Sequence, residues 1–297
     1  MRRLFVIAVL VTACGGSSAT ASNDAPVSPS PSNTESTSPA SPSVSQSPTS
    51  INGRFDIGGR SLFLECVGEG SPTIVMETGQ GGAHTEWSKV VPAIEGSNRT
   101  CTYDRANIGA SDKAPTPRTS ADVVADLHRL LAAAGVGPPY LLVGHSLGGI
   151  SIRLFASTYP KEVVGLVLVD PTPTTILEDA CGILDTAGCQ EIRSEFEPPP
   201  SDGVDLVRSA TEVQAAGSLP AVPLVVLAAD DHGLTSVDPA VRQQFEAKWR
   251  ARQQELAASV PGGRLQPVSS GHDVPNLHPE AVIAAIRDVL AQVLRPG

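Results

Sequence analysis

Residues 141–160 read LLVGHSLGGISIRLFASTYP, and the pattern changes at a single serine, Ser146. The apolar run before it is typical of a buried strand, and the apolar positions after it recur at helical spacing. Gly144 and Gly148 flank the serine in the pattern G-x-S-x-G, because glycine permits the sharp turn that joins strand to helix. The hydroxyl would then lie above the first turn of the helix, where free N–H groups favour negative charge. We therefore expect Ser146 to be a nucleophile and not only a turn residue.

Strand-like and helix-like segments alternate on both sides of this stretch, from residue 52 to residue 297. The alternation predicts one α/β domain with a largely parallel sheet. The expected strands are a hairpin in 53–68, then 72–79, 99–105, 139–146, 163–171, 223–231 and 263–270. The expected helices are 85–94, 118–136, 147–159, 240–260 and 279–294. Residues 172–217 interrupt the alternation with prolines, acidic residues and two cysteines, so we interpret them as an insertion.

A serine hydroxyl is a poor nucleophile at neutral pH unless a general base lies within hydrogen-bond reach. His272 follows the last expected strand, in the segment SSGHDVP, and so lies at the carboxyl ends of the strands, where open α/β sheets place their sites. We expect His272 to be the base. Four other histidines have weaker positions, beside the serine, on a helix face, in a glycine-rich loop that could touch substrate, and at the start of the last helix: His145, His128, His84 and His278.

The imidazole also needs a carboxylate that holds its tautomer and stabilises the charge it gains. Asp231 follows the apolar segment 223–229, and Asp170 ends the apolar segment 163–169. Asp230, beside Asp231, has the same kind of position. Each could equally be a turn residue at a strand end. The residues alone therefore leave the acid open.

An oxyanion formed by attack on a carbonyl needs two fixed N–H donors. One donor is expected from the backbone of Leu147, directly after the serine. The second is expected from the glycine-rich segment ETGQGG at 77–82, from Gln80 or, as second choice, from Gly81.

These residues together resemble a serine hydrolase of the α/β-hydrolase fold, over nearly the whole segment from 52 to 297. The order Ser146, acid, His272 is the order of that fold, and TYDRANIGASD at 102–112 resembles the family segment D-R-x-G-x-G-x-S. Residues 153–170 resemble the helix and sixth strand that follow the nucleophile. The resemblance implies a mostly parallel eight-stranded sheet flanked by helices, with a small lid at about 172–217.

The resemblance also bears on the acid. The family's seventh strand typically has its aspartate eight positions after a proline, and counting from Pro223 leads to Asp231, although Ala228 replaces the usual glycine. Some members take the acid from the end of the sixth strand, so Asp170 remains an alternative to the preferred Asp231.

Two positions depart from the family pattern. Asn107 replaces a glycine, which asparagine can do because it tolerates left-handed backbone. Thr78 precedes Gly79 where many members have His-Gly, so the oxyanion loop departs from the family pattern directly before the expected donor.

The resemblance implies a cysteine pairing as well. The fold sets its second strand antiparallel beside its fourth, so Cys66 and Cys101 could meet, and Cys181 and Cys189 would close a small loop in the lid. An exported chain is the setting in which such disulfides persist.

The beginning of the chain indicates export. Residues 1–13 combine two arginines with a ten-residue apolar core that is too short to span a bilayer, and the run ends in VTAC, which resembles a bacterial lipobox. Cys14 would then carry the lipid. In residues 15–50, 23 of 36 are Ser, Thr or Pro, so we expect 14–51 to be a disordered tether and 52–297 the catalytic domain. The expected location is the outer face of a bacterial cytoplasmic membrane, or secretion if the lipobox is not used.

Composition narrows the remaining functions. The formal net charge of −10 argues against nucleic acid as a partner, and no Cys/His cluster has metal-ligand spacing, so neither a metal nor a cofactor is expected. The leading hypothesis is a monomeric serine hydrolase that cleaves a small or medium carboxylic ester through an acyl-enzyme on Ser146. The alternatives are an acyltransferase or amidase with the same triad and a binding lipoprotein without catalysis.

Overall fold

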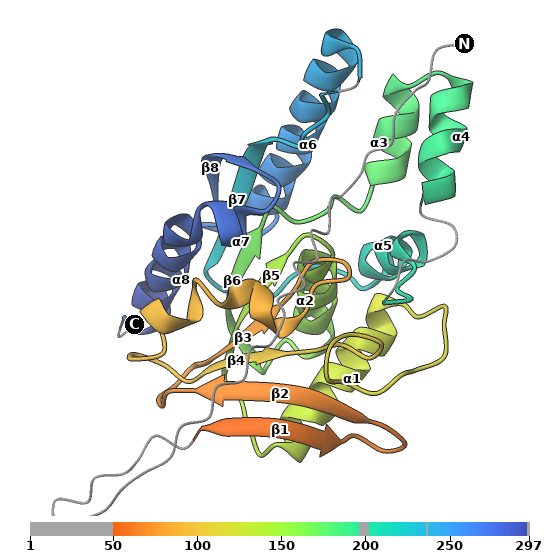
Figure 1. Cartoon of the computed structure of the whole chain (residues 1–297). Coiled ribbons are helices and arrows are strands. Elements are labelled where there is room, and N and C mark those ends of the chain that lie inside the picture. Colours follow the sequence, from red (N-terminus) through yellow and green to blue (C-terminus); the bar gives the residue numbers. More distant parts are fainter. Residues whose placement is uncertain (1–49, 196–201, 236, 296–297) are drawn as a thin grey trace, which may run out of the picture. The chain divides into compact units, whose positions relative to one another are not determined.

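The central element is an eight-stranded sheet in the computed structural model, which describes residues 50–195, 202–235 and 237–295 (Figure 1). The strand order is β1-β2-β4-β3-β5-β6-β7-β8. β2 is antiparallel to β1 and β4, and the remaining neighbours are parallel, which confirms the predicted mostly parallel sheet. The strands are β1 (Ile51–Asp56), β2 (Ser61–Val67), β3 (Thr73–Glu77), β4 (Thr100–Tyr103), β5 (Tyr140–His145), β6 (Val163–Val169), β7 (Leu224–Asp231) and β8 (Arg264–Gly271).

Burial separates the centre of the sheet from its edge. Every residue of β3 and β5 is buried, as expected for parallel strands covered on both faces. Along β1 and β2 the more and less buried positions alternate, because only one face of this hairpin packs on the protein. The predicted turn of the hairpin is present, with φ of 90° at both Gly58 and Gly59.

Helices cover both faces of the sheet (Figure 1). One apolar core joins α1, α2, α5 and the C-terminal part of α6, and a second joins α8 to the segment 87–94. The helices are α1 (Ser120–Ala133), α2 (Leu147–Thr158), α5 (Leu206–Ala215), α6 (Pro239–Ala258), α7 (Val274–Leu277) and α8 (Pro279–Val293). In the described part of the chain, no helix is long and apolar enough to cross a membrane.

The helix predicted at 85–94 is wrong in type. The chain forms two short 3-10 helices there, η1 (His84–Trp87) and η2 (Val91–Ala93). Pro92 lies in the first turn of η2, and a proline ring would clash with the preceding turn of a continuous α-helix. Trp87, Val90 and Ile94 nevertheless bury their side chains as a helix would have done.

The insertion between β6 and β7 contains α3 (Ile176–Ile183), α4 (Thr186–Glu195) and α5. Cys181 and Cys189 form a disulfide that joins α3 to α4. Cys66 and Cys101 form a second one between directly opposed positions of β2 and β4. Both disulfides are the pairs that the resemblance implied. The expected signal peptide, Cys14 and nearly all of the tether fall on residues 1–49 and lie outside the described residues.

Candidate active site

The turn between β5 and α2 presents Ser146 with φ of 53° and ψ of −120°, a conformation that costs a non-glycine residue free energy. The neighbouring glycines make this turn possible by close packing. A Cβ on Gly144 would lie 2.6 Å from the carbonyl oxygen of Gly148, and a Cβ on Gly148 would lie 2.6 Å from that of Glu77. The two glycines of the G-x-S-x-G pattern are therefore required because neighbouring backbone atoms leave no room for a side chain at either position. Ser146 itself is 9 % exposed.

His272 follows β8 and lies against the serine. Its Nε2 is 2.9 Å from Ser146 Oγ, so the imidazole can accept the hydroxyl proton. This contact joins residues 126 positions apart, and it is the one predicted from the sequence.

The acid beside His272 is Asp170 and not the preferred Asp231. Asp170 Oδ2 lies 2.6 Å from His272 Nδ1, and its side chain is fully buried. Asp170 has φ of 40°, so the backbone turns at the end of β6 and directs the carboxylate towards β8. Asp231 instead continues β7 opposite Gly271, is exposed, and accepts the N–H of Gly233. Asp230 accepts the N–H of Ser270. The preference for Asp231 is therefore wrong on geometry.

Asp170 accepts four hydrogen bonds. Oδ1 receives Trp249 Nε1 at 2.8 Å and the N–H of Ala229 at 3.1 Å. Oδ2 receives His272 Nδ1 and, at 3.0 Å, His232 Nε2. Burial would raise the pKa of this carboxyl, but the hydrogen bonds and charges of the two imidazoles hold the pKa well below its ordinary value. Asp170 is thus a fixed anion at neutral pH.

His232 bridges two carboxylates and was not singled out from the sequence. Its Nδ1 lies 2.6 Å from Glu246 Oε2 on α6, while its Nε2 binds Asp170. Burial lowers the pKa of His232, but the hydrogen bonds and charges of Asp170 and Glu246 outweigh this and raise it to about 9. His232 is therefore an imidazolium at neutral pH. The available signal was its position directly after Asp231 at a strand end.

His145 supports His272 from the other side. Its Nε2 lies 2.9 Å from the carbonyl oxygen of His272, and its Nδ1 lies 2.8 Å from Glu86 Oε1. Burial lowers the pKa of His145, but the charge and hydrogen bond of Glu86 raise it above its ordinary value. With both nitrogens facing acceptors, His145 fixes the backbone that carries His272, which agrees with the expected local role.

The pKa of His272 itself lies below its ordinary value. Burial is the largest cause, and the charges of His145 and His232 add to it, while the hydrogen bond and charge of Asp170 oppose it. A neutral imidazole that donates from Nδ1 to Asp170 has its Nε2 lone pair directed at Ser146. The site therefore holds His272 in the form that a general base needs.

The glycine-rich loop after β3 supplies one free N–H. Gly82 donates to the carbonyl oxygen of Gly79 at 3.1 Å, and Gly81 has φ of 71°, which identifies a type II turn with Gln80 at its first central position. Gly81 N–H donates to Asp202 Oδ2 at 2.9 Å, so the second-choice donor is occupied. Within the described residues, the N–H of Gln80 donates to no protein acceptor, and that of Leu147, the first residue of α2, has no intrahelical acceptor.

Arg105, from the segment that resembles the family motif, holds this loop. The guanidinium donates to the carbonyl oxygens of Thr78 and Gly79 at 2.9 and 2.6 Å and pairs with Asp202 at 3.0 Å. A Cβ on Gly79 would lie 3.5 Å from Ser146 Cβ, so the loop lies against the nucleophile. Asn107, at the other departure from the family pattern, has φ of 76° as expected.

The remaining expected candidates do not reach the serine. His84 binds Asp104, His128 binds Glu162, and His278 binds Glu280. Thr172, which the sequence did not suggest, has its Oγ1 3.3 Å from Ser146 Oγ.

One cluster in the described part of the chain has distances compatible with a metal: Asp170, His232 and His272. Each of their imidazole nitrogens already has a hydrogen-bond partner, namely Ser146, Glu246 or Asp170 itself. A cation bound there would displace the hydrogen bonds that orient His272, so the donor set fits a proton-transfer site better than a metal site.

Known proteins resemble this chain in sequence and structure. A family model of the alpha/beta hydrolase fold matches residues 72–255. The uncharacterized protein YqjL of Bacillus subtilis (strain 168) is 30% identical over 233 residues, which cover 75% of this chain and 85% of YqjL. The "Probable transporter efuK" of Hormonema carpetanum is 36% identical over 129 residues, but the chain spans only 18% of that protein.

Among solved structures, a thermophilic esterase from Thermogutta terrifontis matches with a TM-score of 0.56 and 20% identity, covering 84% of this chain and 100% of the esterase. This likeness concerns the fold. Because the family model spans more than half of the chain, the chain belongs to the alpha/beta hydrolase fold family.

Proposed function

We propose that this protein is a serine hydrolase in which Ser146 attacks a carboxylic ester. The observation that carries the proposal is the continuous hydrogen-bonded chain from Ser146 Oγ through His272 to Asp170, at 2.9 and 2.6 Å. His272 Nε2 takes the hydroxyl proton as Oγ bonds to the carbonyl carbon, and Asp170 stabilises the resulting imidazolium.

The carbonyl oxygen becomes an oxyanion in this step. The N–H groups of Gln80 and Leu147 are the donors assigned to it. Leu147 directly follows Ser146, Gln80 follows Gly79, which lies against Ser146, and neither N–H has another acceptor among the described residues. His272 then returns the proton to the leaving alkoxide, which departs as an alcohol and leaves an acyl-enzyme on Ser146. Water, deprotonated by His272, resolves the acyl-enzyme to a carboxylic acid.

The proposed substrate is an ester with a small or medium acyl group. The described part of the insertion consists of helices of 8 to 10 residues, and only 4 % of the chain is aromatic, which does not favour a large lipid-binding surface. A series of p-nitrophenyl esters of increasing chain length tests this, with the highest kcat/KM expected for the short chains.

A fluorophosphonate probe tests the chemistry independently of substrate identity. One covalent label per molecule is expected in the wild type and none in Ser146→Ala. Unlabelled wild-type protein at neutral pH would contradict the nucleophile. Hydrolysis of amides but not esters, or an ester product formed with added alcohol, would instead favour the amidase or acyltransferase alternative.

We further propose that the chain is exported and tethered through a lipid on Cys14. The support is the short apolar core and the VTAC sequence before the Ser/Thr/Pro-rich segment. Metabolic labelling with radioactive palmitate in a bacterial host is expected to label the wild type and not Cys14→Ser. The mass of the processed protein then distinguishes lipidation at Cys14 from ordinary secretion, in which the signal peptide is removed and no lipid is added.

A further inference from the structure

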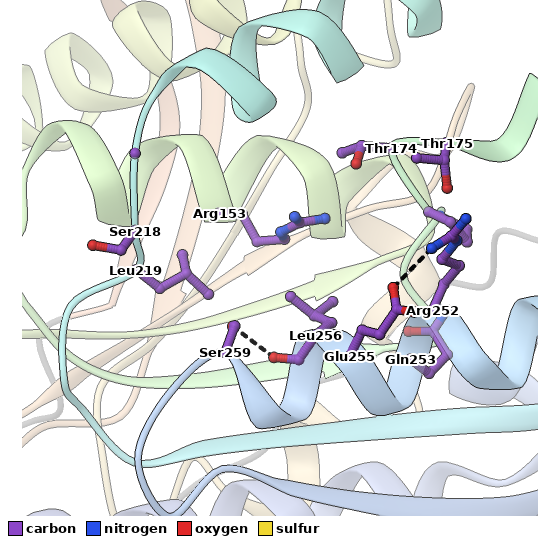
Figure 2. A pocket seen from close by; sticks show the side chains of 12 residues that line it. Arg153, Thr174, Thr175, Ser218, Leu219, Arg252, Gln253, Glu255, Leu256 and Ser259 are labelled. Atoms are coloured by element: carbon purple, nitrogen blue, oxygen red, sulfur yellow. Dashed lines mark hydrogen bonds and ion pairs between the residues drawn. The ribbon is translucent and has the colours of Figure 1, made fainter. Parts of the chain in front are cut away.

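A second site lies away from the proposed nucleophile. A cavity of about 280 Å³ lies between α2, α6 and the segments that flank the insertion, and it does not include Ser146, His272 or Asp170. Its lining combines apolar surface with polar side chains, among them Arg153, Thr174, Thr175, Ser218, Arg252 and Gln253. Figure 2 shows Arg153 leaving α2 and pointing into this space, with Arg252 and Glu255 facing it from α6.

Arg153 has no counter-ion in the described residues. Its Nε is out of contact with solvent, and in the part of the chain that the structure describes it has no hydrogen-bond partner and no carboxylate within ion-pair distance of its guanidinium. Glu255, the carboxylate in the lining, is bound to Arg252 at 2.9 Å, and Arg252 also pairs with Asp179 at 2.8 Å. Burial lowers the pKa of Arg153 to about 10, so the side chain still carries its charge at neutral pH. The side chain is only partly exposed, so its charge loses part of its hydration without gaining a counter-ion, and a bound anion would offset that loss.

Gln253 contributes a second unsatisfied group. The residue is 1 % exposed, and its Oε1 has no donor in the described part of the protein. Its Nε2 donates to the carbonyl oxygen of Pro171 at 2.7 Å, which fixes the amide orientation and leaves Oε1 as an acceptor. Because Oε1 is also out of contact with solvent, a ligand in the cavity cannot reach it, and the cavity wall offers the positive fork of Arg153.

We propose that this cavity binds a small oxyanion, such as a phosphate or a hydroxycarboxylate. The anionic oxygens accept the terminal N–H groups of Arg153. The hydroxyls of Thr174 and Ser218 can complete the shell, while that of Thr175 already donates to Asp179.

The site abuts the segment that carries the proposed acid. Pro171, bonded to Gln253, directly follows Asp170, and the next residue, Thr172, contacts Ser146. A bound oxyanion would therefore brace the loop from 171 to 175 from behind, without touching the reacting atoms.

Isothermal titration calorimetry at constant ionic strength tests the site, with sodium phosphate, sodium glycolate and sodium acetate as probes and sodium chloride as the reference. Wild-type protein is expected to bind phosphate or glycolate, and to bind acetate more weakly because acetate offers fewer oxygen atoms to the N–H and O–H donors of the cavity. Arg153→Gln is expected to weaken binding about 10- to 100-fold, the effect of losing a charge-assisted contact. Arg250→Gln is the matched control, because Arg250 is exposed on α6 and outside the cavity lining.

Thermal unfolding gives a second readout. Phosphate or glycolate should raise the melting temperature of wild type and Arg250→Gln, but not that of Arg153→Gln. If Arg153→Gln does not fold, Ser218→Glu replaces it, since Ser218 is exposed at the cavity wall and a carboxylate there would compete with the oxyanion. Absence of binding by both phosphate and glycolate to wild type, or equal binding by the Arg153 or Ser218 variant, would overturn the proposal.

Discussion

His232 and His272 bind the same oxygen atom. His232 Nε2 lies 3.0 Å and His272 Nδ1 lies 2.6 Å from Asp170 Oδ2. The carboxylate therefore accepts hydrogen bonds from two imidazoles. One of them, His232, is charged at neutral pH and is also held by Glu246. A carboxylate whose charge is partly balanced by His232 stabilises a second imidazolium on His272 less strongly than an unshared one.

Replacement of the acid distinguishes the two aspartates. Asp170→Asn should lower kcat by about 10⁴-fold, because the amide no longer holds the correct tautomer of His272 or stabilises its charge. Asp231→Asn should leave kcat unchanged, since Asp231 is exposed and only closes its own turn. Steady-state hydrolysis of p-nitrophenyl butyrate measures both. An equal loss in the two variants would contradict the assignment of Asp170.

The charge on His232 should appear in the pH profile. In wild type this cation disfavours protonation of His272, so its loss in His232→Gln should raise the pKa of His272. The acidic limb of kcat/KM should then move to higher pH, because His272 is inactive as a base when protonated. His278→Gln, a change at an exposed histidine that pairs with Glu280, is the control and should not move the limb. An unchanged or lowered limb in His232→Gln would count against this role.

Stability should also depend on His232. Its pKa is raised from an ordinary 6.5 to about 9 in the folded protein, so its stabilisation is complete below pH 6.5 and is lost as the pH rises through 9. The free energy of unfolding, measured with urea at several pH values, should fall over this range in wild type. The fall should be smaller in His232→Gln and unchanged in His128→Gln. Parallel declines in all three proteins would assign the pH dependence to other groups.

The turn that carries Gln80 offers a test of the oxyanion donor. Proline is favoured at the first central position of a type II turn, so Gln80→Pro should keep the turn while removing the N–H. The expected loss in kcat is about 10²- to 10³-fold. Gln80→Ala keeps the N–H and should retain most of the activity. A matched loss in both variants would indicate that the side chain, and not the backbone, is what matters; circular dichroism verifies that each variant folds.

The two disulfides should differ in their contribution to stability. Loop-closure entropy predicts a loss of about 4 kcal/mol for Cys66→Ala/Cys101→Ala, whose cysteines are 35 residues apart, and about 2.5 kcal/mol for Cys181→Ala/Cys189→Ala, 8 apart. Urea unfolding of each double variant against wild type measures these losses. Thiol titration should find these four cysteines unreactive until reductant is added, and four reactive thiols in the native protein would contradict both bonds.

Much of the fold could be predicted because its signals are local. The apolar run at 141–143 and the helical spacing after Ser146 specify a strand and a helix within 20 residues, and the same is true of most other elements. The segment 85–94 failed because Pro92 interrupts a pattern whose apolar spacing is otherwise helical. The pairing of Cys66 with Cys101 needed the strand order of a known family, since spacing alone leaves several connectivities open.

The sequence by itself determined the α/β architecture, the turn that presents Ser146, and the strand end from which His272 reaches it. Only the tertiary structure decided that Asp170 and not Asp231 meets His272, that His232 shares the carboxylate, and that the N–H of Gly81 donates to Asp202. The physical reason is that a local pattern encodes backbone conformation, whereas the direction of a side chain at a strand end depends on the φ and ψ of one or two residues. The partners of Asp170, for example, are His232 and His272, which lie 62 and 102 residues away along the chain.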